Sequence, residues 1–280
     1  MFSRRALPFP LTLLILTASH WLAAPPSLAR AAEFFSASLN FAGESVPLNQ
    51  AEVFEGVDQE LLLLSEAKAR TFLSLRRAAK TLPAVESALK ESGVPNDFKY
   101  LPLTLTNLNP TYRSGGRRGI WRLSEGEARA MGLTVNKSVD ERLDPVLSSQ
   151  KAAAQLKALR DRYGSWAMAL AALLSEGELA AAQAEAPGEK NFYRLYVPEN
   201  LGKNFYQVIA GKVLYGDPAA YGYRSDQSWP VLAKSRLALS EPQSLKDLAR
   251  EHRLDYKTFR DLNPHILGDI APAGVILNIP

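Results

Sequence analysis

The feature that most constrains the fold is a helical period of apolar residues between Val57 and Ser92. Apolar side chains recur about every 3.6 residues in this stretch, at Leu61, Leu64, Ala67, Phe72, Leu75, Ala79 and Leu82. Pro83 is expected to end this helix, with a second helix over 84–91. The alanine-rich stretches 148–163 and 165–186 are typical of tightly packed helices, and Phe98 to Leu105 is a further buried apolar segment. The pattern predicts a mainly α body over 57–215.

The amino-terminal residues 1–31 are predicted to be a secretory signal peptide. Arg4 and Arg5 precede an apolar stretch over 6–24, and Ala29-Arg30-Ala31 offers small residues for cleavage. The alternative is an uncleaved membrane anchor, in which case the protein stays at the membrane. We expect the mature protein in the periplasm or elsewhere in the cell envelope. Residues 32–56 show no sustained period and are predicted to be an extended arm.

Composition excludes several classes of function. The 33 Lys and Arg residues against 29 Asp and Glu give a net charge of only +4, and the basic residues are scattered, so nucleic acid is not an expected partner. The chain has no cysteine, which excludes disulfides and thiol catalysis. No two of its three histidines have a metal-ligand spacing on a shared helix. We therefore expect no metal and no cofactor.

The carboxyl-terminal residues 235–280 have a different pattern. Residues 235–239 and 275–279 alternate as strands do, while 245–251 and 256–262 have the character of short helices. This order predicts a small α+β (βααβ) module, joined to the body by a linker over 224–234.

Ordered motifs in the body resemble a known family. Phe98-Lys99-Tyr100-Leu101-Pro102-Leu103, Asn109-Pro110 and Gly119-Ile120-Trp121 are similar to strings of the membrane-bound lytic murein transglycosylases of the D type, and the strings 131–133, 139–145 and 169–172 follow in the family order. The resemblance covers about 41–223. It implies a lysozyme-like all-helical domain over 57–223 and peptidoglycan glycan strands as the partner. The tail resembles a LysM module at 244–249, Leu262-Asn263-Pro264 and Ile279-Pro280.

The departures from the family concern its catalytic site. The resemblance implies a catalytic glutamate at position 105, where this chain has Leu105, which has no proton to donate. General acid-base catalysis is typically worth about 10²–10⁴-fold in rate. Leu173-Leu174 replaces a Tyr-Asn pair of the family, so two polar site elements have become apolar together. No catalytic residue is assigned; Glu176 is the outside candidate, and Glu86 is predicted to be a solvated helix residue.

The remaining candidate residues are ligand contacts and structural groups. Arg117 and Arg118 either meet peptide carboxylates of the cell wall or are solvated. Asp140, Glu141 and Asp144 are predicted to form caps and ion pairs, with Arg142 as a partner, rather than a metal site. The candidates for substrate binding are Asn109, Tyr112, Ser114, Trp121 and Arg122 in the body, and Glu241, Ser244, Asn263, Pro264 and Ile266 in two loops of the tail.

The interpretation that follows is an exported peptidoglycan-binding protein, a catalytically inactive homologue of lytic transglycosylases that acts as a glycan binder or scaffold. One alternative is an active lytic murein transglycosylase that cleaves the MurNAc-GlcNAc bond with a displaced acid. It requires a carboxylate in the cleft beside Leu105. The other alternative is a protein-interaction module of an envelope complex, in which Leu105, Leu173 and Leu174 form an apolar partner pocket.

Overall fold

The computed structural model describes residues 38–224 and 235–279. The predicted signal peptide (1–31), residues 32–37 of the predicted arm, nearly all of the predicted linker and Pro280 lie outside the described residues. The described part is mainly helical, as predicted. Its body comprises α2 (Ala51–Glu66), α3 (Lys68–Glu91), α4 (Tyr100–Thr106), α5 (Glu125–Ala130), α6 (Pro145–Tyr163), α7 (Trp166–Glu185) and α8 (Glu199–Gly216), with short 3-10 turns η1 (Asn96–Lys99), η2 (Glu141–Leu143), η3 (Phe192–Arg194) and η4 (Pro218–Tyr221).

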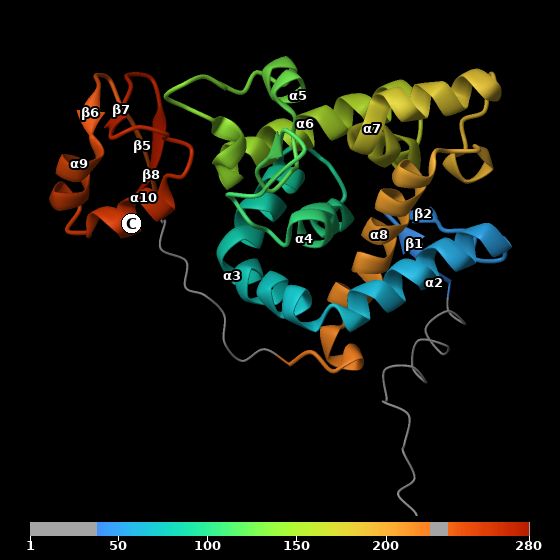
Figure 1. Ribbon diagram of the computed structural model, residues 1–280. Coiled ribbons are helices and arrows are strands. Elements are labelled where there is room, and N and C mark those ends of the chain that lie inside the picture. Colours follow the sequence, from blue (N-terminus) through green and yellow to red (C-terminus); the bar gives the residue numbers. More distant parts are fainter. Residues whose placement is uncertain (1–37, 225–234, 280) are drawn as a thin grey trace, which may run out of the picture.

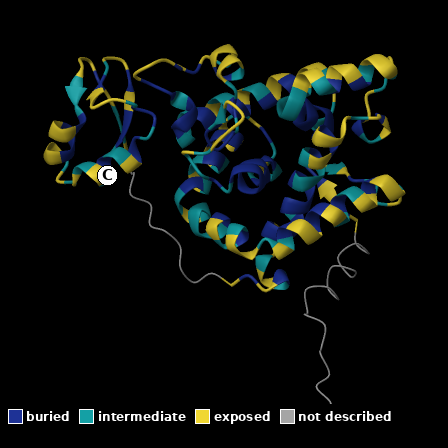
Figure 2. Cartoon of the chain, viewed as in Figure 1, coloured by how far each residue is buried: buried dark blue, intermediate teal, exposed yellow. Residues whose placement is uncertain are grey.

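None of the helices in the described ranges is long and apolar enough to cross a membrane. The short helix α4 lies in the middle of the helical body, and α3 curves around it (Figure 1). All seven residues of α4 are buried. Buried residues gather on α4 and on the faces of the surrounding helices that point toward it (Figure 2).

The expected break at Pro83 is wrong. Helix α3 continues through Pro83, and the break lies instead at Ala67, whose backbone leaves the helical region (φ −77°, ψ 52°). A proline inside a helix removes one backbone hydrogen bond. Here Thr81, Val85 and Leu89 are buried on either side of Pro83, so tertiary packing keeps the segment helical in spite of the proline's low propensity.

The prediction of an extended arm over 32–56 is also wrong in its described part. Residues 40–45 form a small hairpin, β1 (Asn40–Phe41) with β2 (Glu44–Ser45), and α2 begins at Ala51. Phe41 is buried and packs edge-on against Phe98, with ring centroids 5.3 Å apart. The Glu44 carboxylate accepts hydrogen bonds from the first backbone N–H groups of α7, at 2.6 and 3.0 Å. The segment is part of the body because it supplies a core residue and a helix cap.

Helix α4 lies close to α8 because of a glycine. A Cβ added at Gly211 in α8 would lie 2.1 Å from Cγ2 of Thr104 in α4. Glycine therefore permits the close approach of the two backbones. Helix α4 then ends at Asn107, which is left-handed (φ 53°). This packing fixes the position of Leu105, one residue after Thr104.

The carboxyl-terminal segment has the predicted order of elements. Strands β5 (Ser235–Ala238) and β8 (Ile276–Ile279) pair antiparallel, and helices α9 (Leu245–Glu251) and α10 (Tyr256–Leu262) lie between them in sequence. A second short pair, β6 (Gln243–Ser244) with β7 (Ile270–Ala271), was not predicted. Leu245, Phe259 and Leu277 are among the side chains of a small separate core. Val139 of the body packs into that core, so the segment is docked on the body.

Candidate functional site

Leu105 lies in the wall of a cavity of about 400 Å³, which we call the Leu105 cavity. Leu105 is only 7% exposed. Residues from α2, α3, α4 and α8 and from the loop after α4 line this cavity: Glu60, Leu63, Leu64, Ala67, Arg70, Leu105, Tyr112, Arg122, Lys203, Asn204 and Gln207. Its volume is within the usual range of ligand pockets, so the cavity is a candidate ligand site.

A second hollow of about 230 Å³, the Leu173 pocket, adjoins the first. It is lined by Leu101, Arg117, Trp121, Arg122, Leu173, Leu174, Ser175, Glu178, Asn200 and Asn204. Arg122 and Asn204 line both hollows, and the Arg122 guanidinium donates a hydrogen bond of 3.3 Å to Oδ1 of Asn204. This pair therefore separates Leu105 from Leu173 and Leu174.

The backbone of Arg122 is held in an unusual conformation. Its φ of 55° lies in the left-handed region, which is uncommon for residues other than glycine. The backbone N–H of Arg122 donates to the carbonyl of Gly119, and the hydrogen bonds between Arg118 and Leu123 close the turn. This turn follows the hairpin of β3 (Arg113–Ser114) and β4 (Arg117–Arg118). Nε of Arg122 is buried and has no hydrogen-bond partner among the described residues.

One carboxylate, from Glu60 in α2, reaches the Leu105 cavity. Glu60 is 3% exposed. Burial raises the pKa of its carboxyl, and the charges of Lys203 and Arg70 only partly oppose this effect. Glu60 was not among the site residues predicted from the sequence. The available signal was its position, because Val57, Glu60, Leu61 and Leu64 follow the i, i+3, i+4, i+7 spacing of a buried helix face.

Glu176, the outside candidate for a catalytic acid, lies elsewhere. Its carboxylate forms an ion pair with Arg162 and accepts a hydrogen bond of 3.2 Å from the Tyr163 hydroxyl. It lines neither the Leu105 cavity nor the Leu173 pocket. Helix α7 is interrupted at Ser175, whose φ and ψ are not helical, and Glu178 on the following turn lines the Leu173 pocket instead. Glu86 forms a 2.8 Å ion pair with Lys99 on the surface of α3.

The candidate binding residues of the body are distributed over several environments. Tyr112 and Arg122 lie in the Leu105 cavity. Trp121 lines the Leu173 pocket, but it is only 5% exposed and donates its indole N–H to Oγ of Ser149 at 2.8 Å, so it offers little ring surface for a sugar. The Asn109 side chain accepts hydrogen bonds from Thr111 and closes a turn. Ser114 is exposed at the hairpin.

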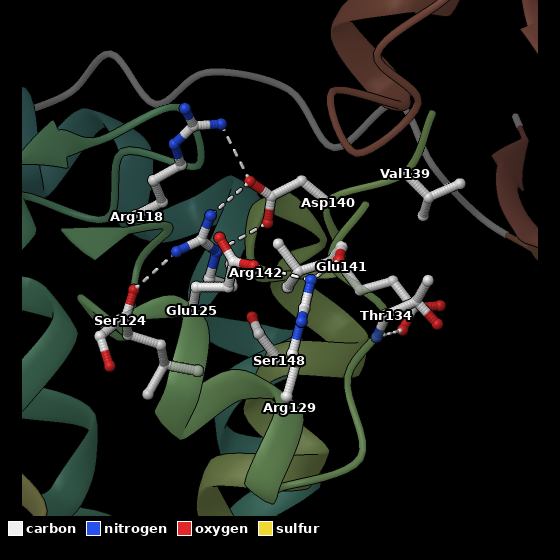
Figure 3. Close-up of polar contacts among 12 residues, drawn as sticks. Arg118, Ser124, Glu125, Arg129, Thr134, Val139, Asp140, Glu141, Arg142 and Ser148 are labelled. Atoms are coloured by element: carbon white, nitrogen blue, oxygen red, sulfur yellow. Dashed lines mark hydrogen bonds and ion pairs between the residues drawn. The ribbon is translucent and has the colours of Figure 1, made fainter. Parts of the chain in front are cut away.

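Asp140 forms the centre of a polar network, drawn in Figure 3. It accepts hydrogen bonds from Arg142 at 2.8 Å and from Arg118 at 3.0 Å. Burial opposes ionisation of Asp140, but the hydrogen bonds and charges of Arg142 and Arg118 outweigh it and hold its pKa below the ordinary value. Asp144 caps α6 by accepting from the N–H groups of Val146 and Leu147. The predicted ion pair with Arg142 and the predicted cap at Asp144 are therefore confirmed.

The two arginines that sequence analysis related to peptide carboxylates already have partners in the protein. Arg118 forms an ion pair with Asp140. Arg117 forms a bidentate ion pair with Glu127, in which its two terminal nitrogens lie 2.7 and 2.9 Å from the two carboxylate oxygens. Both guanidinium groups are thus neutralised by the chain's own acids.

The loop at 263–267 of the carboxyl-terminal segment faces the body. The backbone N–H of Asp140 donates to the carbonyl of His265, and that of Leu267 donates to the carbonyl of Ser138, both at 2.8 Å. Ile266 forms a β-bridge with Val139 and is fully buried. This docking makes the Ile266 side chain inaccessible to a glycan, contrary to the expectation from sequence.

The other tail candidates differ in exposure. Asn263 is fully buried, and its amide bonds backbone groups of Phe259 and Asn278, so its role is structural. Pro264 lines a groove between the segment and the body. Ser244 caps α9, and Glu241 is exposed.

Comparison with known proteins relates the body to one family. The chain matches no curated protein. Residues 64–186 match the family described as Transglycosylase SLT domain. The matched segment extends from the end of α2 through α7 and includes Leu105, Arg122 and Leu173. The helical body is therefore similar, over residues 64–186, to the SLT domain of the lytic transglycosylases that act on peptidoglycan.

Proposed function

We propose that the chain is an exported peptidoglycan-binding protein that does not cleave glycan strands and acts as a binder or scaffold. The observation that carries this proposal is Leu105. In our alignment this residue takes the position of the catalytic glutamate of the family, and it lies in the wall of a ligand-sized cavity. Export rests on the signal-like residues 1–31.

Cleavage of a glycosidic bond needs a proton on the leaving oxygen, and a side chain must supply it. Leucine cannot. Glu176 pairs with Arg162 away from the cavity and so gives no replacement. The apolar Leu173 and Leu174 offer no polar group to orient a sugar or an acid.

Glu60 supports a second candidate function, an active transglycosylase with a displaced acid. It lines the same cavity as Leu105, and burial raises its pKa, which favours the protonated form that a general acid needs. Two observations favour the inactive protein instead. Lys203 and Arg70 promote ionisation of Glu60. Leu173 and Leu174 stand where the resemblance implies a polar Tyr-Asn pair.

The protein-interaction module gains less support. Leu105 and the Leu173-Leu174 pair line separate hollows, and the two residues common to both are the polar Arg122 and Asn204. An extended apolar groove is the usual sign of a helix- or peptide-binding surface, and these leucines do not share one.

Incubation of the purified protein with cell-wall sacculi tests the proposal. We expect the protein to sediment with the sacculi and to release no anhydro-muropeptides above a heat-killed control. Release of such products that is lost in Glu60→Gln and kept in Glu86→Gln would establish the enzyme instead. Failure of the protein to sediment with sacculi would refute peptidoglycan binding itself.

A further inference from the structure

The Leu105 cavity has more cationic than anionic side chains in its lining. Arg70, Arg122 and Lys203 line it, against the single carboxylate of Glu60. No carboxylate lies within ion-pair distance of these three cations in the described parts of the chain. Arg117 and Arg118, which lie near the same site in sequence, are both paired. Three cations without an ion-pair partner among the described residues thus line the Leu105 cavity together.

Arg70 is fixed in place by neutral groups. Its Nε donates to Oδ1 of Asn107 at 2.8 Å, and one terminal nitrogen donates to the carbonyl of Thr104. Asn107 is itself the left-handed residue that ends α4. A guanidinium has five N–H groups, so these contacts orient Arg70 and leave donors for a ligand.

Arg122 is the second oriented cation. Its left-handed backbone and the tight turn from Gly119 to Leu123 direct it to the boundary of the two hollows, where Asn204 accepts one hydrogen bond. Its buried Nε has no hydrogen-bond partner within residues 38–224 and 235–279. A buried donor without a partner is unfavourable, so a ligand acceptor at this place is favourable.

Lys203 supplies a third positive charge to the same cavity. It lies in α8, is exposed, and forms no hydrogen bond with the described residues. Leaving an exposed lysine without an ion-pair partner costs little free energy, because water solvates its charge. An anion that binds beside the two arginines would also be attracted by the charge of Lys203.

We propose that the Leu105 cavity binds a carboxylate of the peptides carried by peptidoglycan, through Arg70, Arg122 and Lys203. Guanidinium groups match the planar carboxylate and bind it with charge-assisted hydrogen bonds. The inference rests on the proposed function and narrows it: the protein recognises glycan that bears acidic peptides, and not bare glycan. Glu60 opposes the ligand's charge, so its removal strengthens binding.

Titration calorimetry at low salt tests this site with three probes. The first is a disaccharide-peptide with free carboxylates, the second is the same molecule with its carboxylates amidated, and the third is inorganic phosphate. We expect the free acid to bind at least about tenfold more tightly than the amidated form, since a hydrogen bond to a charged group is worth about 1.5–3 kcal/mol. Phosphate should compete only weakly. Equal competition by phosphate would overturn the peptide-carboxylate assignment in favour of a general anion site.

Substitutions of the lining residues test whether the preference for the free carboxylate comes from the Leu105 cavity. Lys203→Gln should weaken binding of the free acid at least about fivefold and leave the amidated form unchanged, while Lys137→Gln, an exposed lysine outside the cavity, should have no effect. Arg122→Gln should act as Lys203→Gln does, and Glu60→Gln should tighten binding. The inference is wrong if amidation changes affinity less than twofold and Lys203→Gln binds as Lys137→Gln does. Wild-type binding to sacculi would then still support the proposed function, whereas its loss would refute both.

Discussion

Glu60 in α2 and Leu105 in α4 line one cavity, the first as its only carboxylate among the described residues and the second as part of its apolar wall. The carboxylate of this cavity thus comes from a different helix than Leu105. Its neighbours also differ, because Arg70 and Lys203 act on its charge. Substitutions at Leu105 and at Glu60 should therefore have different effects on the thermal stability of the protein.

Substitution Leu105→Glu should lower the melting temperature without creating cleavage activity. Leu105 is buried in α4, and a carboxyl placed there loses solvation worth about 1–3 kcal/mol, which the cations of the cavity only partly return. Leu173 and Leu174 still provide no polar support for an acid. Thermal unfolding tests the expected loss of stability, and muropeptide release tests the expected absence of cleavage. Leu105→Gln, whose side chain has the shape of glutamate without its charge, is the control for polarity alone. Robust cleavage by Leu105→Glu would show that the rest of the site remains catalytic.

Substitution Glu60→Gln should raise the stability of the protein at neutral pH. Because burial raises the pKa of Glu60 in the folded state, the folded protein binds a proton that the unfolded chain releases, and stability falls as the pH rises above 4.5. Glu60→Gln has no carboxyl to ionise at this position, so it avoids this loss of stability. The difference in melting temperature between the variant and the wild type should therefore grow from pH 4 to pH 7. Glu86→Gln, at an exposed ion pair, should show no such trend. An advantage that is constant across this range would mean that the ionisation of Glu60 is not the cause.

Local sequence patterns predicted many elements because they depend on neighbours along the chain. The apolar period predicted helix over most of α2 and α3, but not the break at Ala67 between them, and the helices over 245–251 and 256–262 have the predicted bounds. The break predicted at Pro83 is wrong because helix propensity is a local property of the sequence. The burial of Val85 and Leu89, which keeps the segment helical, depends on contacts with distant parts of the chain.

The candidate site was predicted only in part, since it depends on contacts between distant segments. Tyr112 and Arg122 were found from the family strings, but Glu60, Arg70 and Lys203 come from helices α2, α3 and α8 and carry no motif. The prediction of Ile266 as a glycan contact is wrong for the same reason. Residues 138–140, which are distant in sequence, cover Ile266 in the structure.

The folded protein should lose stability at mildly acidic pH through His265. His265 is 1% exposed, and its Nε2 lies 3.0 Å from the carbonyl oxygen of Ile276. Burial lowers its pKa; Asp144 and Glu141 oppose this effect, and Arg236 adds to it. A lowered pKa means that the unfolded chain binds the proton more readily, so stability is lost as the pH falls below 6.5. Melting curves from pH 7.5 to 5.5 should show this loss, and His265→Gln should flatten it while His252→Gln should not. An unchanged slope in His265→Gln would contradict the assignment.

Asp144 joins the two parts of the chain through two separate interactions, which substitutions can separate. One carboxylate oxygen caps α6, and the other forms a 2.6 Å ion pair with Arg236 of β5. Asp144→Asn keeps a capping oxygen but loses the charge, so it should retain most of the helix stability while it loosens the docked segment. Asp144→Ala loses both and should cost about 1 kcal/mol more for the missing cap.

Hydrogen exchange measures the docking directly, at the backbone N–H groups of Asp140 and Leu267, which bond across the interface. Arg236→Gln removes the same ion pair without affecting the cap and is the matched control. It should speed exchange at both amides to the same extent as Asp144→Asn, because each variant breaks the same contact from one side. If both variants exchange at the wild-type rate, the ion pair does not hold the segment, and the Val139–Ile266 contact and the two backbone hydrogen bonds suffice on their own.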